Sequence, residues 1–337
     1  MAKRLFLLDG MALVYRAHFA LIRSPIYTSK GVNTSAIYGF ANTLVDLVAS
    51  QKPTHLAVVF DTPAPTERHT IFPDYKANRD AMPEDLASAI PEVKRLIRAF
   101  NVPVIEKDGF EADDVIGTLA LRAAAEGDCE VFMVTPDKDF AQLVDEKVTI
   151  YKPGRGGGEP EIIGLEEVKE HWQVDTPSQV IDILGLWGDA SDNIPGVPGI
   201  GEKTAKKLVG RFGGIKELLE NTDQLKGKQK ENVEAFKEQA LLSRKLATIV
   251  IDAPVELDWS SLKVGEMDNE ALACLLVEFE FNTLGKRLLG EDFVAGRGFG
   301  GSGKEGGAVV TELKSIADVE HDYQLIASGD KVARKAA

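Results

Sequence analysis

The stretch Gly109–Gly117, "GFEADDVIG", places three carboxylates, Glu111, Asp113 and Asp114, directly before an apolar pattern of helical spacing. Acidic residues are common at helix starts, because that end carries unpaired N–H groups and partial positive charge. Simple capping therefore explains the cluster when it is taken alone. The positions of the other acidic residues decide whether it also serves a site.

Three short apolar runs, 5–8, 56–60 and 131–134, have the composition of buried parallel strands. Helical patterns at 37–50 and 114–127 lie between them and fit crossover helices. An acidic residue follows each run: Asp9, then Asp61, then Asp137 and Asp139. Because the carboxyl ends of parallel strands meet at one edge of a sheet, the pattern predicts an α/β fold with one shared acidic pocket.

A further pair of acids, Asp189 and Asp192, lies in the turn-like segment "GDASDNIPG" at 188–196. Together the candidate metal ligands are Asp9, Asp61, Glu111, Asp113, Asp114, Asp137, Asp139, Asp189 and Asp192. Two carboxylates ~4 Å apart repel by roughly 4 kcal/mol at an effective dielectric of 20, so such a group must retain protons or bind cations. No His or Cys accompanies them, and oxygen ligands favour Mg²⁺ or Mn²⁺. Each acid taken singly is equally well explained as a helix cap or an Asx turn.

Basic residues gather in the connection at 62–82, which is long for a loop and contains several prolines. It carries Arg68, Tyr75, Lys76 and Arg79. Lys76 and Arg79 would share a face if the segment were helical, and the Tyr75 ring could stack on a base. The segment predicts a phosphate clamp beside the acids, and a solvated basic loop is the alternative.

A second basic region begins with "GVPGIGEKTAKKLVG" at 196–210. It is not a P-loop, because Glu202 separates Gly201 from Lys203 and no strand precedes it. A glycine-rich hairpin between two helices fits better, with a helix N-terminus available to a phosphate. Residues 203–245 contain eleven Lys and Arg against six Asp and Glu, a net charge of +5 in a chain of −14. This predicts contact with a nucleic-acid backbone, although a solvated helical face has the same composition.

Bulk properties describe an ordinary water-soluble protein with room for two domains in 337 residues. No apolar run approaches the ~20 residues of a membrane span, and Asp9 interrupts the N-terminal run too early for a signal peptide. The two cysteines have no metal-like spacing, which predicts a reduced cytoplasmic setting. The acidic net charge argues weakly against nucleic-acid binding, but it is only an average.

Several motifs now resemble those of a known family: "LLDG", "YRAHFA", "AVVFD", "YKANR", "GFEADDVIGTLA", "TPDKDFAQLV", "GDASDNIPGVPGIGEKTA" and "FEFNTL". In this order, over residues 4–289, they resemble the flap-endonuclease-like 5′ nucleases, the family of the N-terminal domain of bacterial DNA polymerase I. The resemblance implies a PIN-like parallel-sheet domain at 1–175 with an arch segment at 62–90. An all-α helix-hairpin-helix region would follow at 176–290, then a glycine-rich linker at 291–307. Residues 308–337 would be the lead-in to a further domain or a disordered tail.

Roles follow from the resemblance residue by residue. Asp9, Asp61, Glu111 and Asp113 would surround one ion, with Asp114 close by, and Asp137, Asp139, Asp189 and Asp192 would surround a second. Tyr75, Lys76 and Arg79 would act on the scissile phosphate. The DNA-binding residues would be Arg68, Gly199, Gly201, Lys203, Thr204, Lys206 and Lys207, with a K⁺ ion at the hairpin. Glu67 departs from the aromatic residue usual before Arg68, which leaves the role of that neighbourhood open.

The implied activity is two-metal hydrolysis of DNA at 5′ flaps, nicks and 5′ ends, in primer removal and repair. We expect a monomeric, nucleoid-associated bacterial protein without membrane contact, continuous with polymerase domains in a longer chain. A stand-alone flap nuclease and a catalytically silent DNA-binding module are the alternatives. A PIN-type ribonuclease usually lacks the hairpin region, and an Asp-nucleophile phosphatase needs a second acid two residues after Asp9, where this chain has Met11.

Overall fold

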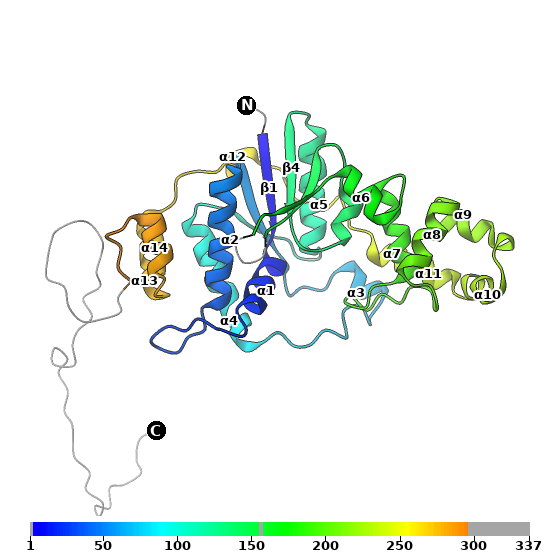
Figure 1. Cartoon of the computed structure of the whole chain (residues 1–337), viewed down its shortest axis with the longest axis horizontal. Coiled ribbons are helices and arrows are strands. Elements are labelled where there is room, and N and C mark those ends of the chain that lie inside the picture. The colour runs from blue at the N-terminus through cyan, green and yellow to red at the C-terminus, as the bar shows by residue number, and fades with distance from the viewer. Residues whose placement is uncertain (1–2, 155–157, 296–337) are drawn as a thin grey trace, which may run out of the picture. The chain divides into compact units, whose positions relative to one another are not determined.

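The computed structural model describes residues 3–154 and 158–295, which belong to one compact unit. Its sheet has six strands in the order β3-β2-β1-β4-β5-β6 (Figure 1). Strands β1 to β5 pair in parallel, and β6 pairs antiparallel at one edge. The strands are β1 (Lys3–Asp9), β2 (His55–Phe60), β3 (Val104–Glu106), β4 (Cys129–Val134), β5 (Val148–Lys152) and β6 (Glu161–Ile163).

The three predicted strands are confirmed as β1, β2 and β4, the neighbours at the centre of the sheet. Leu7 of β1 pairs with Ala57 on one side and Met133 on the other. The two predicted crossover helices are confirmed as α2 (Ser35–Gln51) and α5 (Ala112–Ala125). The edge strands β3 and β6 have three residues each, too few to give a pattern in the sequence.

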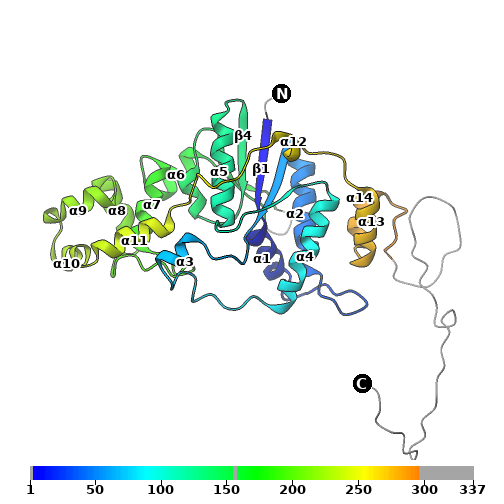
Figure 2. The same cartoon turned by 180° about the vertical axis from the view of Figure 1, so that it is seen from behind.

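The remaining helices frame the sheet and extend beyond it (Figures 1 and 2). In chain order they are α1 (Gly10–Ala20), α3 (Glu67–Ile71), α4 (Glu84–Ala99), α6 (Leu165–Trp172), α7 (Val180–Trp187), α8 (Glu202–Phe212), α9 (Ile215–Glu220), α10 (Gly227–Ala235), α11 (Lys237–Ala247), α12 (Trp259–Leu262), α13 (Asn269–Glu278) and α14 (Asn282–Leu289). Three short 3₁₀ segments are Asp139–Leu143, Pro177–Gln179 and Thr222–Gln224. Both views place α8 to α10 and the α13–α14 pair at opposite ends, with the sheet between them.

Both faces of the sheet are covered, which explains why its strands are apolar throughout. Leu5 and Leu7 point into one core with α5 and helices of the region after residue 175, whereas Phe6 and Leu8 point into another with α1, α2, α4, α13 and α14. Successive side chains of a strand alternate between faces, so β1 contributes to both cores. The helical region thus shares its core with the sheet, and a domain boundary near residue 175 stays a prediction.

The predicted glycine-rich hairpin between helices is confirmed at the turn that joins α7 to α8. Asp189 and Ile194 exchange backbone hydrogen bonds of 2.9 and 2.8 Å across this turn. Gly188 (φ +80°) and Gly196 (φ +59°) both have left-handed backbones, and a Cβ on Gly188 would lie 2.4 Å from the Ile194 carbonyl oxygen. Glycine is therefore required where the turn closes, and the turn fixes Asp189 and Asp192 beside the sheet.

The first residues of the predicted linker at 291–307 are packed against the protein, which the prediction did not include. Phe293 is buried, and Ala295 exchanges two hydrogen bonds with the Asn282 side chain, at 2.8 and 3.1 Å. Residues 291–295 therefore pack against α14. The rest of that prediction, and the lead-in or tail at 308–337, lie outside the described residues. Among the helices that the structure describes, none is long and apolar enough to cross a membrane.

Candidate active site

The acids that follow the central strands lie together at the carboxyl edge of the sheet. Asp9 caps α1, accepting hydrogen bonds from the Ala12 N–H and the Thr135 hydroxyl, both at 3.0 Å. Burial raises the pKa of Asp9 to about 7, and the neighbouring charges of Asp61 and Asp137 act in the same direction. Asp61 in turn accepts a 2.9 Å hydrogen bond from the Ala112 N–H at the start of α5. The edge of the sheet and the first turn of α5 thus form one acidic region.

The opening stretch caps α5 and also contributes carboxylates to this region. Glu111 is the N-cap residue, and its N–H donates to the Asp114 carboxylate at 3.1 Å, as in a capping box. The helix-capping interpretation is therefore confirmed for Glu111 and Asp114. Burial raises the pKa of Asp113 well above its usual range, helped by Asp114 and Glu111 and opposed by Arg68. A cation close to such a carboxylate would lower its pKa again.

Asp139 and Asp189 meet at Lys138, a residue that the sequence reasoning did not select. The Lys138 ammonium forms an ion pair with Asp189 and lies 3.3 Å from Asp139 Oδ1. Burial and the charge of Asp137 raise the pKa of Asp139 to about 7. The sequence does contain a signal for Lys138, because in "TPDKD" it lies between Asp137 and Asp139 after a predicted strand. A residue at that position lies at the same edge of the sheet as the two acids.

The arch segment closes over the acids through Tyr75, Lys76 and Arg79. Lys76 Nζ lies 2.7 Å from Glu111 Oε2 and 3.7 Å from Asp192 Oδ2, and Arg79 is 2.5 Å from Asp192 Oδ1. Although burial alone would raise it, Lys76 and Arg79 hold the pKa of Asp192 below its usual value. Residues 73–78 of this segment form turns rather than a helix, and Lys76 has a left-handed backbone (φ 58°). Lys76 and Arg79 nevertheless reach the same carboxylate.

Three side chains that were expected to contact DNA are buried in the structure. Tyr75 is only 3% exposed, so its ring cannot stack on a base, and its hydroxyl donates to Glu111 at 3.1 Å and to Asp192 at 3.0 Å. Arg68 is buried and pairs with Asp114 instead of facing solvent for DNA. Lys206 is also buried and donates to the His171 carbonyl at 2.8 Å. These residues hold the site's elements together.

Asp114 differs from the other eight acids because its oxygen atoms are fully used. Two Arg68 nitrogens donate to it at 2.8 Å each, and the N–H groups of Glu111 and Val250 donate at 3.1 and 2.8 Å. No lone pair is left to face an ion. The structure therefore corrects Asp114 from candidate ligand to structural partner of Arg68.

The remaining acids fit a cation site, although lysines now occupy part of it. Among residues 3–154 and 158–295, no three His, Cys, Asp or Glu side chains form a ready metal-binding group. The buried Glu111 Oε1 accepts no hydrogen bond, and the buried Asp139 Oδ1 has only the ion-pair contact of 3.3 Å with the Lys138 ammonium. Buried carboxylate oxygens are costly without a partner, and a divalent cation is the partner that oxygen-only donors suit. These carboxylates fit Mg²⁺ or Mn²⁺, and that they bind such an ion stays a prediction.

The hairpin residues lie at the start of α8, away from the sheet edge. Gly201 is its N-cap and is exposed, as are Lys203 and Lys207, which share one face of the helix at four-residue spacing. Thr204 is half-buried, and Gly199 has a left-handed backbone (φ +77°). The Asn232 side chain of α10 donates to the Pro198 carbonyl at 2.7 Å and steadies the hairpin. This surface can offer a helix N-terminus and two cations to a phosphate backbone.

The parallel sheet with an acid-lined edge, followed by a helical hairpin, defines a PIN-like nuclease architecture. Two family models match the chain: the 5′-3′ exonuclease N-terminal resolvase-like domain over residues 4–173, and the 5′-3′ exonuclease C-terminal SAM fold over residues 175–270. The chain belongs to the 5′-3′ exonuclease family.

Curated relatives and solved structures agree with this membership. DNA polymerase I of Bacillus subtilis is 44% identical over 292 residues, covering 86% of this chain and 32% of the relative. DNA polymerase I of Mycobacterium tuberculosis is 38% identical over 284 residues, covering 84% and 31%. The chain thus spans about a third of the length of these relatives.

In fold, the chain is similar to T5 5′-exonuclease with bound zinc ions (TM-score 0.62, 22% identity, 87% of this chain and 100% of that one). It is also similar to the catalytic core of Rad2 in complex with DNA substrate (TM-score 0.56, 19% identity, 85% and 92%).

Proposed function

We propose that this chain hydrolyses DNA phosphodiester bonds at 5′ ends and 5′ flaps with the help of divalent cations. The observation that carries the proposal is the convergence of acids from three strand ends, the α5 start and the α7–α8 turn on one edge, where the buried Glu111 Oε1 accepts no hydrogen bond. Family membership supports it, as do the metal ions named for T5 5′-exonuclease and the DNA substrate named for Rad2.

Two groups of carboxylates would hold two Mg²⁺ or Mn²⁺ ions. The first group is Asp9, Asp61, Glu111 and Asp113, and the second is Asp137, Asp139, Asp189 and Asp192. When bound, such ions lower the pKa of water and offset negative charge on a phosphate. The protein supplies the rigid frame, because Asp9, Asp61 and Glu111 are fixed by hydrogen bonds to backbone N–H groups or by helix capping.

Lys76 and Arg79 would stabilise charge on the reacting phosphate. Both now contact Asp192, so a phosphate entering the site would compete with that carboxylate for them. Tyr75 would orient Glu111 and Asp192 through its hydroxyl rather than touch the substrate. Gly199, Gly201, Lys203, Thr204 and Lys207 would hold duplex DNA at the hairpin, with K⁺ bound by backbone carbonyls.

We further infer that the chain acts as the front third of a bacterial DNA polymerase I, in primer removal and repair at the nucleoid, and as a monomer. The support is its match to about a third of such relatives. A stand-alone nuclease remains the alternative, and the length of the encoding gene distinguishes the two.

The decisive experiment compares labelled 5′-flap, nicked and single-stranded DNA with Mg²⁺ and with EDTA. We expect Mg²⁺-dependent cleavage of flap and nicked substrates, and none in EDTA. Binding of flap DNA without cleavage under any divalent cation would instead identify a silent structure-specific binding module.

A further inference from the structure

Two lysines bridge the acids of this site in the same way. Lys76 links Glu111, the N-cap of α5, to Asp192 in the α7–α8 turn. Lys138 links Asp139, at the sheet edge, to Asp189 in the same turn. Each ammonium thus joins one carboxylate of the sheet region to one of the turn. Neither Glu111 Oε1 nor Asp139 Oδ1, both buried, accepts a hydrogen bond, and Asp139 Oδ1 has the Lys138 ammonium 3.3 Å away.

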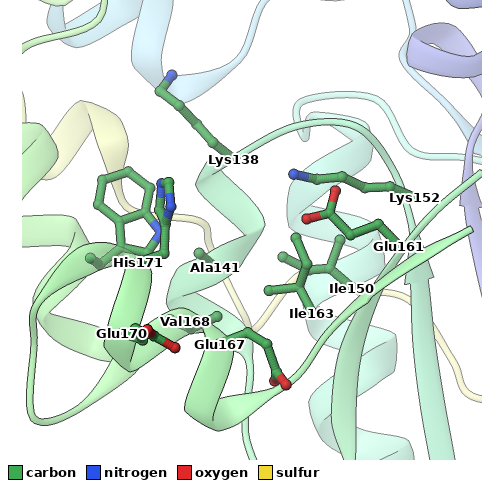
Figure 3. Close-up of a pocket in the computed structure, with 11 residues that line it drawn as sticks. Lys138, Ala141, Ile150, Lys152, Glu161, Ile163, Glu167, Val168, Glu170 and His171 are labelled. Carbon is green, nitrogen blue, oxygen red and sulfur yellow. The ribbon is translucent and has the colours of Figure 1, made fainter.

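Besides these two carboxylates, the Lys138 ammonium has the Trp187 ring 5.8 Å away, measured to the ring centroid. Its side chain is 38% exposed and lies between two cavities of about 400 and 410 Å³. One is lined by residues of β5, β6 and α6, and in Figure 3 the Lys138 side chain points away from its apolar residues Ile150 and Ile163. The other is lined by the turn from Trp187 to Pro195. Lys138 can therefore leave its carboxylates without breaking the core.

A divalent cation and the Lys138 ammonium cannot share the same carboxylate oxygens, because both need them at contact distance and repel each other. An ion that binds Asp139 and Asp189 must therefore displace Lys138. The displaced cation would stand beside the site where the proposed reaction brings a DNA phosphate, and phosphate is the anion that a lysine binds well.

We propose that Lys138 is a further functional residue, an internal counter-ion that competes with divalent cations for Asp139 and Asp189 and, once displaced, binds a phosphate of the DNA backbone. The first half concerns the protein and divalent cations in the absence of DNA. The second half rests on the proposed nuclease function.

The first test measures Mn²⁺ binding without DNA, by electron paramagnetic resonance and calorimetry. Lys138→Met keeps the length of the side chain but removes the competing charge, so we expect the weaker Mn²⁺ site to tighten about tenfold. Lys138→Arg keeps the charge and should bind Mn²⁺ as the original protein does. Lys169→Met, which breaks an exposed ion pair with Glu166 on α6, is the matched control and should change nothing. Unchanged or weaker Mn²⁺ binding in Lys138→Met would mean that the lysine is a structural ion pair only, and would overturn the proposal.

The second test measures affinity for a 5′-flap DNA in EDTA and in Ca²⁺. In EDTA Lys138 stays with its carboxylates, so Lys138→Met should bind DNA as tightly as the original protein. In Ca²⁺ it should bind about tenfold more weakly, because one charge-assisted contact is lost, and Lys138→Arg should restore binding. An equal loss in both conditions would overturn the displacement. Absence of any Mg²⁺-dependent cleavage by the original protein would instead refute the proposed function, and the Mn²⁺ experiment would still decide the first half.

Discussion

Arg68 and Asp114 form a buried ion pair with two hydrogen bonds, in which Arg68 Nη1 and Nη2 each lie 2.8 Å from a different carboxylate oxygen. Arg68 also donates to the carbonyls of Leu246 (3.0 Å), in the last turn of α11, and of its C-cap Thr248 (2.8 Å). Asp114 accepts from the Val250 N–H. The pair therefore joins α3 of the arch, the acidic start of α5 and the chain that leaves the helical region. The position of Glu111 and Asp113 depends on it.

Replacing Arg68 should be strongly destabilising. Arg68→Met leaves the Asp114 carboxylate buried beside an apolar side chain, and breaking a buried pair in this way typically costs about 3–5 kcal/mol. Urea denaturation in EDTA measures the free energy of unfolding directly. A loss below about 1 kcal/mol would show that water reaches Asp114 and that the pair does not join these elements.

The neighbouring residue supplies the matched control. Glu67 forms a 3.0 Å ion pair with Lys245, so it joins the same two segments, but both side chains are 60% exposed or more. Glu67→Ala should change stability by about 0–1 kcal/mol. The unusual Glu67 thus has a local partner, and its role is separate from that of Arg68.

Asp113 should be required for cleavage but not for DNA binding. Asp113→Ala removes a buried carboxylate from the first group, so we expect Mg²⁺-dependent turnover to fall below detection while affinity for flap DNA changes less than about threefold. Cleavage in a gel assay and affinity by fluorescence anisotropy test the two parts separately. Retained turnover would remove Asp113 from the list of ligands.

The α8 lysines should separate into DNA-binding and structural residues. Lys203 and Lys207 are exposed, so replacing both by Ala should weaken flap binding and lower the slope of log affinity against log salt by up to about 2. Lys206 is buried against His171 and pairs with Glu202 at 2.7 Å, so Lys206→Ala should lower the melting temperature and leave the salt slope unchanged. A reduced salt slope in Lys206→Ala would contradict this division.

Sequence patterns predicted the centre of this fold well because its signals are local. Runs such as 56–60 are long enough to be recognised as strands, and an acid after each one is visible without coordinates. The gathering of these acids followed from parallel pairing alone.

Contacts between side chains far apart in the chain have no comparable local signal in the sequence. The sequence shows Arg68 as one base in a basic loop, and only the fold reveals that it lies 2.8 Å from Asp114. The same holds for Tyr75, whose burial depends on α5 and the α7–α8 turn, and for Lys206 and Lys138, whose partners are charges that folding brings close. Charge in a sequence therefore indicated the region of the site, and contacts across the chain decided which residues face it.

The pKa of Asp9 makes the stability of the metal-free protein depend on pH. The folded protein keeps the Asp9 proton up to a pH of about 7, whereas the unfolded chain releases it near 3.8. Between these values the folded state binds more protons at Asp9, so the contribution of Asp9 to stability is full below this window and falls as pH rises through it. Asp139, whose pKa is also raised to about 7, adds to the fall. The lowered pKa of Asp192 acts at lower pH and does not oppose it.

Asp9→Asn removes the ionisation while keeping an oxygen that can accept the N–H of Ala12. In EDTA, thermal denaturation between about pH 4 and 7 should show a clear loss of stability for the original protein and a smaller loss for the variant, with the difference reaching at most about 4 kcal/mol because each pKa unit corresponds to about 1.36 kcal/mol. Mg²⁺ favours the ionised carboxylates, so adding it should reduce the loss in the original protein more than in Asp9→Asn. Identical pH dependence of the two proteins in EDTA would mean that Asp9 is already ionised in the fold, and its place among buried, cation-seeking carboxylates would have to be abandoned.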